Sequence, residues 1–460
     1  MSDKNIILNV DSYKASHYLQ YPPNTTQVSS YIEARGGKYQ DAVFFGLQMF
    51  IKAYLTKPVT HADADEAKAI FNAHGVAFNE AGWRNIVDKF DGYLPIKIQA
   101  VAEGTVMPVK NAMVQVVNTD PDSAWLTSYV ETALLRAVWY PTTVATGSWN
   151  SKRIIQKYLQ QTADSDAGLA FKLHDFGARG ATTEEAAAVG GAAHLVNFQG
   201  TDTISGIIAA RRYYAADMAG FSIPAAEHST ITSWGRDNEA AAYANMLAQF
   251  AGEGKLVAVV SDSYDLFNAI DNIWGDELKE QVENAGGTLI IRPDSGDPVS
   301  IVLETVERLM NKFGFAINAK GYRVLPDYIR VIQGDGISQQ TIEEILEAMK
   351  GQKQSADNIA FGMGGELLQK VNRDTMQFAM KASAAKVDGV WRDVYKDPVT
   401  DQGKRSKKGR LAVVREPDGE IITIREEALG ERENMLVTVF NNGKLLKEYS
   451  FDDVRARASL

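Results

Sequence analysis

The sequence predicts an α/β protein in which an irregular (β/α) barrel is combined with a second, mostly antiparallel β domain built from both chain ends. Between about residue 170 and residue 370, short apolar runs that end in polar clusters alternate with helical patterns, which is typical of a parallel sheet. Before and after this region, alternating residues and tight turns indicate antiparallel strands. Apolar residues make up 45% of the 460 residues, so the chain can build more than one core.

Residues 1–150 are expected to form the N-terminal part of the α+β domain. Residues 95–118 alternate around a turn at Glu103-Gly104, as antiparallel strands do. Residues 123–160 have helical periodicity, and we expect this helix to break near Pro141 because proline lacks the backbone N–H.

Residues 151–374 are expected to form the barrel domain, which would contain the active site. About seven apolar runs recur here, a number that favours a closed or nearly closed barrel. They cover residues 171–173, 194–198, 223–226, 256–260, 289–292, 329–332 and 358–361. An open, doubly wound sheet is the structural alternative.

Residues 375–460 are expected to form a β segment that packs with the N-terminal part. Strand patterns cover residues 377–387, 410–415, 420–424 and 436–440. Turns at 417–419 and 441–443 separate the later strands.

Charge and cysteine content exclude several classes of protein. The formal net charge of −10 argues against a general nucleic-acid-binding surface, and the absence of cysteine excludes disulfides and thiolate chemistry. The first residues do not form a signal peptide, and no apolar run is long enough to span a membrane. We therefore expect a cytoplasmic protein that binds neither nucleic acid nor membrane.

Two glycine-rich loops, Gly334-Asp335-Gly336 and Gly362-Met363-Gly364-Gly365, each follow an expected strand and precede a helix. Glycines allow backbone N–H groups to approach an anion, and the helix N-terminus adds positive potential. The loops after the last strands of such barrels often bind phosphate. The loops therefore predict a phosphorylated ligand.

Acidic side chains follow most of the expected barrel strands, where parallel strands bring their carboxyl ends together. They are Asp175, Asp202, Asp262, Asp294 and Asp335. Carboxylates that face a phosphate site need a cation, and Mg²⁺ held by oxygen ligands and substrate phosphates fits this need. Arg179 and Arg292 would balance the acids or bind a phosphate.

Other residues allow two interpretations from physical chemistry alone. His228 is either a structural histidine or a nucleophile that accepts a phosphoryl group. Phe176 either offers an aromatic face to a planar ligand or belongs to the core. The basic run 404–410 is either a solvated loop or a phosphate clamp.

Several motifs occur in an order that points to one family. They are Asp11-Ser12-Tyr13-Lys14, His174-Asp175-Phe176-Gly177, Gly200-Thr201-Asp202-Thr203, Ala226-Glu227-His228-Ser229-Thr230, Ile291-Arg292-Pro293-Asp294-Ser295-Gly296, Gln333-Gly334-Asp335-Gly336 and Lys404-Arg405-Ser406-Lys407-Lys408-Gly409-Arg410. Together they resemble the nicotinamide phosphoribosyltransferases, which are type II phosphoribosyltransferases.

The resemblance implies a pentosyltransferase of NAD biosynthesis. Such an enzyme joins nicotinamide to phosphoribosyl pyrophosphate, giving nicotinamide mononucleotide and pyrophosphate, with Mg²⁺. It further implies ATP as a co-substrate, coupled through a phosphohistidine, and a homodimer with shared active sites. A nicotinate phosphoribosyltransferase is the alternative.

The resemblance also assigns the nicotinamide site. Phe176 would stack on one side of the pyridine ring and the partner subunit's Tyr13 on the other. Arg179 would position the ring, and Asp202 would accept a hydrogen bond from the carboxamide. Because a carboxylate at Asp202 would repel nicotinate, we expect nicotinamide to be the preferred substrate.

The remaining roles concern the sugar, the phosphates and ATP. The resemblance makes His228 the phosphorylated histidine. It places Asp262 and Asp294 near the ribose and the metal, with Asp294 as a metal ligand. Arg292 would bind the ribose or a phosphate. The residues that would hold the ribose hydroxyls and 5′-phosphate are Gly334, Asp335, Gly364 and Gly365. The partner's cations for pyrophosphate and ATP would be Arg35, Arg373, Lys381 and Lys404. Met363 departs from the family pattern, which has a small polar residue at this position.

Overall fold

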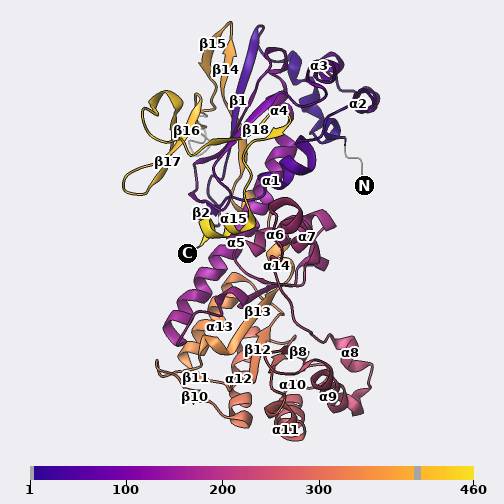
Figure 1. Ribbon diagram of the computed structural model, residues 1–460, viewed down its shortest axis with the longest axis vertical. Coiled ribbons are helices and arrows are strands. Elements are labelled where there is room, and N and C mark those ends of the chain that lie inside the picture. The colour runs from indigo at the N-terminus through magenta and orange to yellow at the C-terminus, as the bar shows by residue number, and fades with distance from the viewer. Residues whose placement is uncertain (1–4, 398–405, 460) are drawn as a thin grey trace. The chain divides into compact units, whose positions relative to one another are not determined.

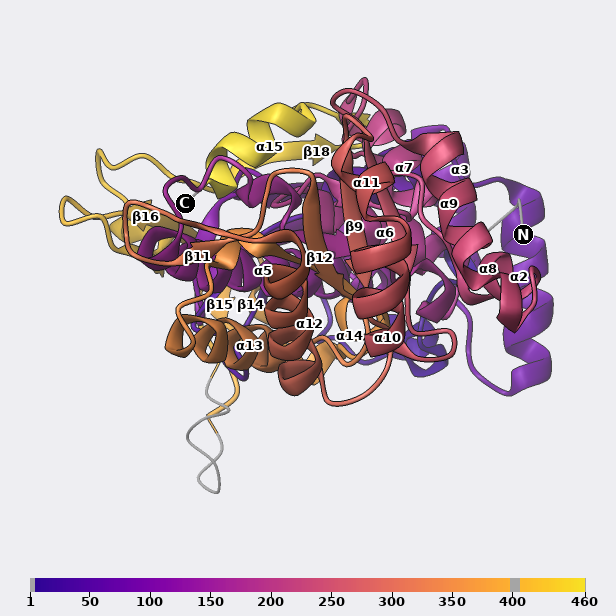
Figure 2. The ribbon, with the colours of Figure 1, turned by 90° about the horizontal axis from the view of Figure 1, so that it is seen from below.

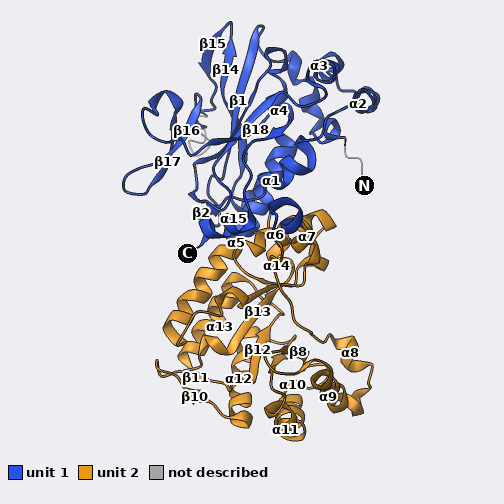
Figure 3. Cartoon of the chain, viewed as in Figure 1, with its two compact units in different colours: residues 1–146, 209–216, 372–459 blue, residues 147–208, 217–371, 460 orange. Residues whose placement is uncertain are grey.

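The computed structural model describes residues 5–397 and 406–459, and the chain divides into two compact units (Figure 3). Unit 1 contains residues 1–146, 209–216 and 372–459, and unit 2 contains residues 147–208 and 217–371. Two helices, α5 (Glu131–Thr162) and α7 (Ile204–Tyr214), begin in one unit and end in the other.

Unit 1 is built on an antiparallel sheet of seven strands, in the order β15-β14-β1-β5-β3-β18-β19. These strands are β1 (Thr25–Glu33), β3 (Ile96–Ala100), β5 (Ala112–Asn118), β14 (Ala379–Val387), β15 (Val390–Asp393), β18 (Val437–Asn441) and β19 (Lys444–Leu445). The short pairs are β2 (Asp41–Val43) with β4 (Val106–Pro108), and β16 (Leu411–Arg415) with β17 (Ile421–Arg425). The other helices are α1 (Leu47–Phe50), α2 (His61–His74), α3 (Glu80–Phe90), α4 (Leu126–Tyr129) and α15 (Phe451–Ala458).

Both chain ends build this sheet. Strand β1 pairs with β14 from Thr25 opposite Val387 to Glu33 opposite Ala379, and β18 pairs with β3. In Figure 1 the indigo β1 accordingly lies beside the orange β14. The predicted second β domain from both chain ends is therefore confirmed.

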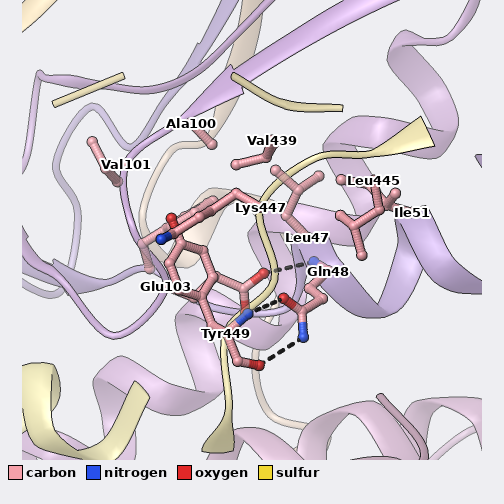
Figure 4. Close-up of a pocket in the computed structure, with 11 residues that line it drawn as sticks. Leu47, Gln48, Ile51, Ala100, Val101, Glu103, Val439, Leu445, Lys447 and Tyr449 are labelled. Carbon is pink, nitrogen blue, oxygen red and sulfur yellow. Dashed lines mark hydrogen bonds between the residues drawn. The ribbon is translucent and has the colours of Figure 1, made fainter. Parts of the chain in front are cut away.

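A buried glutamate joins three separate segments of unit 1. The Glu103 carboxylate accepts hydrogen bonds from the backbone N–H groups of Gly46 (2.9 Å) and Gln48 (2.6 Å), and from the Tyr214 hydroxyl (2.5 Å). The Gln48 side chain then bonds the backbone of Tyr449, as Figure 4 shows in the hollow that these residues line. Burial raises the pKa of Glu103, although these hydrogen bonds oppose the change.

The predicted break at Pro141 is wrong, because α5 continues through this residue. The ring of Pro141 packs on Gly46, where an added Cβ would lie 2.3 Å from the proline Cγ and 3.3 Å from the carbonyl oxygen of Ala137. The glycine leaves the room that the ring needs. The helix therefore continues although proline cannot donate a hydrogen bond to the Ala137 carbonyl.

Unit 2 contains a parallel sheet in the order β7-β6-β13-β12-β9-β8. These strands are β6 (Leu173–Asp175), β7 (Gly200–Thr201), β8 (Leu256–Val260), β9 (Thr288–Arg292), β12 (Ile329–Gln333) and β13 (Ile359–Met363). The helices are α6 (Glu184–Leu195), α8 (His228–Thr232), α9 (Glu239–Phe250), α10 (Leu266–Asn268), α11 (Lys279–Glu283), α12 (Pro298–Phe313), α13 (Gln339–Gly351) and α14 (Gly365–Leu368). A small hairpin joins β10 (Ala316–Ile317) to β11 (Arg323–Val324), and Figure 2 shows α12 and α13 beside β12.

The strand predicted at residues 223–226 is wrong, because these residues belong to an irregular segment, 221–226, that bonds to both edges of this sheet. Phe221 bridges to Gly200 at the β7 edge, and Ala225 bridges to Ala258 at the β8 edge. Hydrogen bonds of 2.7 to 3.0 Å support both bridges. The sheet therefore curls into the irregular barrel that the sequence predicts.

The inner face of the barrel carries Ala258, Ile290 and Ile332, which form one buried cluster with the partly buried Phe176 and Ala360. The strand register aligns Ala258 with Ile290 and Ile332 with Ala360. Because side chains alternate along a strand, residues two or four positions further on lie on this same inner face. This alternation determines which polar residues reach the mouth, which is the end of the barrel formed by the carboxyl ends of its strands.

The strand predicted at residues 194–198 is wrong. Helix α6 extends to Leu195, and the strand that follows it, β7, contains only Gly200–Thr201. His194 is buried and stacks on Phe198, with ring centroids 5.3 Å apart. A short apolar run does not distinguish a buried helix end from a buried strand.

Among the described residues, no helix is both long enough and apolar enough to cross a membrane.

We predict that unit 1 depends on Glu103. Replacing Glu103 with alanine leaves the donors of Gly46, Gln48 and Tyr214 unpaired, and should lower the free energy of unfolding by about 3 kcal/mol. Glu103→Gln should cost less, about 1–2 kcal/mol, because an amide keeps one acceptor oxygen. Urea unfolding followed by tryptophan fluorescence measures both. Glu431→Gln, at an exposed position, is the control, and equal midpoints for Glu103→Ala and the control would contradict the prediction.

Candidate functional site

The polar residues at the barrel mouth belong to the inner face of the sheet. The register aligns His174 with Gly200 on one side and with Gly362 on the other. Phe176 and Asp202 follow these positions by two residues, as Arg292 follows Ile290. Alternation therefore directs these side chains to one mouth.

Asp202 is held by hydrogen bonds at this mouth. His174 Nε2 lies 3.2 Å from Asp202 Oδ1, and the Ser222 hydroxyl donates to the same oxygen. Burial would raise the pKa of Asp202, but these two hydrogen bonds and the charge of Arg292 outweigh it and lower the pKa. Asp202 is therefore a fixed, ionised acceptor.

The Phe176 ring lies beside this acceptor. Its centroid is 5.0 Å from that of His174, and it covers Gly362 so closely that an added Cβ there would lie 1.9 Å from Phe176 Cε2. Gly362 thus makes room for the ring. The ring also packs on the inner cluster of the barrel, so both interpretations of Phe176 hold.

His228 lies in an acidic environment at the start of α8. Its Nε2 is 3.3 Å from Asp294 Oδ2 and 3.9 Å from Asp262 Oδ1, and its Nδ1 is 3.2 Å from the Ser263 hydroxyl oxygen. A carboxylate only accepts hydrogen bonds, so it favours a proton on Nε2. Nδ1 then carries the lone pair, which accepts a hydrogen bond from the Ser263 hydroxyl.

Asp262 is almost completely buried, with 4% of its side chain exposed. Its Oδ2 accepts hydrogen bonds from the Asp294 backbone N–H (2.9 Å) and the Ser295 hydroxyl. Within the described part of the chain, Asp262 Oδ1 and the nearby Arg292 Nε are buried without a hydrogen-bond partner. Such atoms normally have partners, so they point to a ligand.

The remaining loops extend the same mouth. An added Cβ at Gly334 would lie 3.3 Å from Phe176 and 3.7 Å from Asp294 Oδ1, and one at Gly364 would lie 3.9 Å from the Phe176 carbonyl oxygen. Gly365 faces open space. The acids, the aromatic ring and the glycine loops therefore form one continuous surface.

Asp335 and Arg179 lie on the loops around this surface, and both are exposed. Asp335 follows Gly334, and its backbone carbonyl accepts a hydrogen bond from the Gln333 side chain (2.9 Å). Arg179 occupies the short helical turn Ala178–Gly180, where Gly180 is close to Gly365.

Asp175 and Met363 do not face the mouth. They are opposite one another in the register of β6 and β13, on the outer face of the sheet, and both are buried. Asp175 accepts a hydrogen bond from the Gly177 N–H (2.7 Å), and burial raises its pKa. The expectation that Asp175 joins the acids at the mouth is therefore wrong, and the departure at Met363 removes no side chain from the site.

The acids fit a metal ion that arrives with a phosphorylated substrate. Among the described residues, no group of three or more histidine, aspartate or glutamate side chains is arranged to hold a metal by itself. Mg²⁺, however, is commonly bound by one or two carboxylates plus substrate phosphates. Asp262 Oδ1, which has no hydrogen-bond partner among the described residues, and the adjacent Asp294 could supply such carboxylates.

The predicted phosphate-binding cations lie in unit 1. Arg35 follows β1 and donates to the Gln377 carbonyl oxygen (3.1 Å), and Arg373 pairs with Asp374 (2.9 Å). Burial lowers the pKa of Lys381 on β14, and the charges of Arg35, Lys396 and Arg373 lower it further, while the charge of Glu131 opposes the change. Mutually repelling cations kept this close together favour an anionic ligand.

Lys404 lies outside the described residues. Two later cations of the basic run have partners in the protein, because Lys407 pairs with the buried Glu33 and Arg410 pairs with Glu426 (3.0 Å). These two residues therefore stabilise unit 1.

Tyr13 is 60% exposed, on the short helical segment Ser12–Leu19 of unit 1. An ion pair between the buried Lys14 and the partly exposed Glu131 (2.6 Å) fixes this segment to the start of α5. The ring packs edge-on against His17, with centroids 5.1 Å apart. Its outer face remains available for a ligand.

Four residues that contact the predicted site have no functional role in the sequence-based predictions: His174, Ser222, Ser263 and Ser295. Counting by twos from Phe176 would have found His174, because residues two apart share a strand face. The serines lie on irregular loops, where no periodicity predicts their direction.

Comparison with known proteins identifies the family. Residues 171–444 match the nicotinate phosphoribosyltransferase (NAPRTase) family model, and residues 5–98 match the model of the nicotinamide phosphoribosyltransferase N-terminal domain. A nicotinamide phosphoribosyltransferase of Xanthomonas campestris pv. campestris is 55% identical over 99% of this chain and 98% of its own length. One of Acinetobacter baylyi is 33% identical over 97% and 96%.

Two solved structures share the fold at 15% sequence identity. They are a nicotinate-nucleotide pyrophosphorylase of Pyrococcus furiosus (TM-score 0.65, covering 100% of this chain and 96% of that one) and the human nicotinic acid phosphoribosyltransferase (TM-score 0.54, covering 97% and 92%). Fold, site and full-length sequence identity lead to one assignment. The chain belongs to the nicotinamide phosphoribosyltransferase family.

Proposed function

We propose that this protein transfers the 5-phosphoribosyl group from phosphoribosyl pyrophosphate to nicotinamide in NAD salvage. The observation that carries the proposal is the continuous mouth on which the ionised Asp202 and the Phe176 ring lie beside the unpartnered atoms of Asp262 and Arg292. The first pair fits a planar amide, and the second fits a sugar phosphate and its metal. The 55% identical relative is named for the same reaction.

The reaction requires little acid–base chemistry. The pyridine nitrogen of nicotinamide uses its lone pair to form the bond to C1′ of the ribose, while the bond from C1′ to pyrophosphate oxygen breaks. Phe176 and Asp202 would orient the ring, and the acids of the mouth would stabilise positive charge that develops on the sugar. Mg²⁺ held by Asp262 and Asp294 would neutralise the leaving pyrophosphate.

Nicotinamide fits Asp202 better than nicotinate does. Its amide N–H₂ can donate to the carboxylate, whereas the nicotinate carboxylate would meet a second negative charge. The description of the matched NAPRTase family and the solved structures keep nicotinate as the alternative substrate.

We further propose that two subunits share each active site. The barrel mouth belongs to unit 2, whereas Tyr13 and the cations Arg35, Arg373 and Lys381 belong to unit 1. A partner subunit would supply the second face of the aromatic clamp and the positive charge for pyrophosphate and ATP.

ATP coupling would proceed through His228. The lone pair of Nδ1 would attack the γ-phosphorus of ATP, the bond to the β-phosphate oxygen would break and ADP would leave. Asp294 would hold the proton on Nε2 and stabilise the charge on the ring. Water would later cleave the phosphohistidine to release phosphate.

One experiment tests the main proposal. The protein is incubated with phosphoribosyl pyrophosphate, Mg²⁺ and either nicotinamide or nicotinate, with and without ATP, and the mononucleotides are separated by chromatography. The proposal expects nicotinamide mononucleotide, formed more efficiently when ATP is present. Product from nicotinate alone would support the alternative, and no product from either base would refute both.

Asp202→Ser should narrow the preference for nicotinamide. The serine hydroxyl still accepts a hydrogen bond but no longer repels nicotinate, so the ratio of the two kcat/KM values should fall at least about tenfold. Steady-state kinetics with both bases measures this ratio. An unchanged ratio would remove the role given to Asp202.

His228→Ala should abolish labelling by ATP. Wild-type protein incubated with [γ-³²P]ATP should carry base-stable, acid-labile label on Nδ1 of one histidine, because the carboxylates hold the proton on Nε2. His61→Ala, which removes an exposed histidine paired with Asp88, should keep the full label. Label that survives in His228→Ala, or label on Nε2, would contradict the assignment.

Lys381 should make pyrophosphate binding depend on pH. Its pKa is lowered in the free protein, so the affinity should decline as pH rises through that value and the lysine loses its charge. As the pH rises from about 7 to about 10, we expect the affinity of wild type to fall and that of Lys381→Arg, which stays charged, to fall less. Calorimetric titration with pyrophosphate measures both. The control Lys386→Arg, on the same strand, should follow wild type, and identical curves for all three proteins would exclude Lys381.

A further inference from the structure

We propose that His174 and Ser222 are positioning residues that orient the Asp202 carboxylate, so that its Oδ2 faces the carboxamide of the substrate. This inference rests on the proposed function. It identifies the residues through which the barrel sets the preference for an amide.

Both hydrogen bonds reach the same oxygen of Asp202. His174 Nε2 lies 3.2 Å from Oδ1, and the Ser222 hydroxyl also donates to Oδ1. No side chain in the described part of the chain donates to Oδ2, while 49% of the Asp202 side chain is exposed. The carboxylate therefore has one oxygen held by the protein and one available to a ligand.

The packing around His174 selects the donor nitrogen. An added Cβ at Gly200 would lie only 2.6 Å from His174 Nδ1, so this nitrogen faces the main chain of β7 at van der Waals distance. The carboxylate near Nε2 accepts but does not donate, so the proton of a neutral ring belongs on Nε2. Only 13% of the His174 side chain is exposed, and the ring is fixed in this orientation.

The same histidine also contacts the aromatic platform. Its ring centroid is 5.0 Å from that of Phe176, at an interplanar angle of 52°. One side chain thus sets the position of the amide acceptor relative to the ring that would stack on the pyridine. A substrate with an amide on a six-membered ring must match this distance between the Asp202 carboxylate and the Phe176 ring.

Ser222 ties the acceptor to the closure of the barrel. It lies between the bridges of Phe221 to β7 and Ala225 to β8, in the segment that joins both edges of the sheet. Its hydroxyl therefore approaches Asp202 from one side of β7, whereas His174 on β6 approaches from the other side. Two donors from different segments hold the carboxylate more firmly than one could.

The test is a double-mutant cycle with Asp202. In wild-type background, His174→Leu should raise the KM for nicotinamide roughly tenfold and Ser222→Ala roughly fivefold, with kcat within about twofold, because a hydrogen bond to a charged group is lost. In an Asp202→Ala background, the same substitutions should change KM by less than about twofold. His174→Gln, which keeps a donor nitrogen at similar reach, should restore most of the loss.

The control is His61→Leu, which removes an exposed histidine that pairs with Asp88 at 2.8 Å outside the site. It should leave the KM unchanged. If His174→Leu does not fold, the cycle can be completed with Ser222→Ala and Asp202→Ala, because Ser222 is exposed and its substitution should not affect folding.

The outcomes separate this inference from the proposed function. Equal increases in KM with and without Asp202, or no increase in either background, would overturn the positioning role while leaving the activity intact. A wild-type protein that forms no nicotinamide mononucleotide would overturn both.

Discussion

The buried Asp262 carboxylate fixes the loop that carries Asp294, and the phosphate end of the mouth depends on this interaction. One of its oxygens accepts the Asp294 N–H at 2.9 Å and the Ser295 hydroxyl, which joins the end of β8 to the loop after β9. A carboxylate this deeply buried is costly unless it is compensated, so the hydrogen bonds also stabilise its charge. Asp294 is thereby held between Arg292 and His228, at 3.6 and 3.3 Å.

Much of the barrel and its mouth could be predicted from the sequence. Apolar runs followed by polar clusters indicated parallel strands, and the carboxyl ends of such strands meet at one edge. Asp202, Asp262, Asp294 and Arg292 lie at that edge as expected. Asp175 was misplaced because the prediction considered only its position at a strand end, whereas its side chain points to the outer face.

Features that depend on distant residues could not be predicted. Pro141 remains helical because Gly46 makes room for its ring, and Glu103 is buried because Tyr214 and the backbone after Phe45 supply its donors. Nothing near these residues in the sequence carries that information. The choice between a structural and a nucleophilic His228 likewise depends on Asp294 and Ser263, which lie more than thirty positions away.

The pairing of β1 with β14 has a consequence for synthesis on the ribosome. Thr25 pairs with Val387, so a central strand of the unit 1 sheet lacks a neighbour until most of the chain has been made. At about 5–20 residues per second, the roughly 350 intervening residues take on the order of 20–70 seconds to translate. During this interval the nascent N-terminal segment has an open hydrogen-bonding edge, which is an aggregation hazard and a binding site for chaperones. Unit 2, encoded almost entirely between the two strands, can complete its own barrel in the meantime.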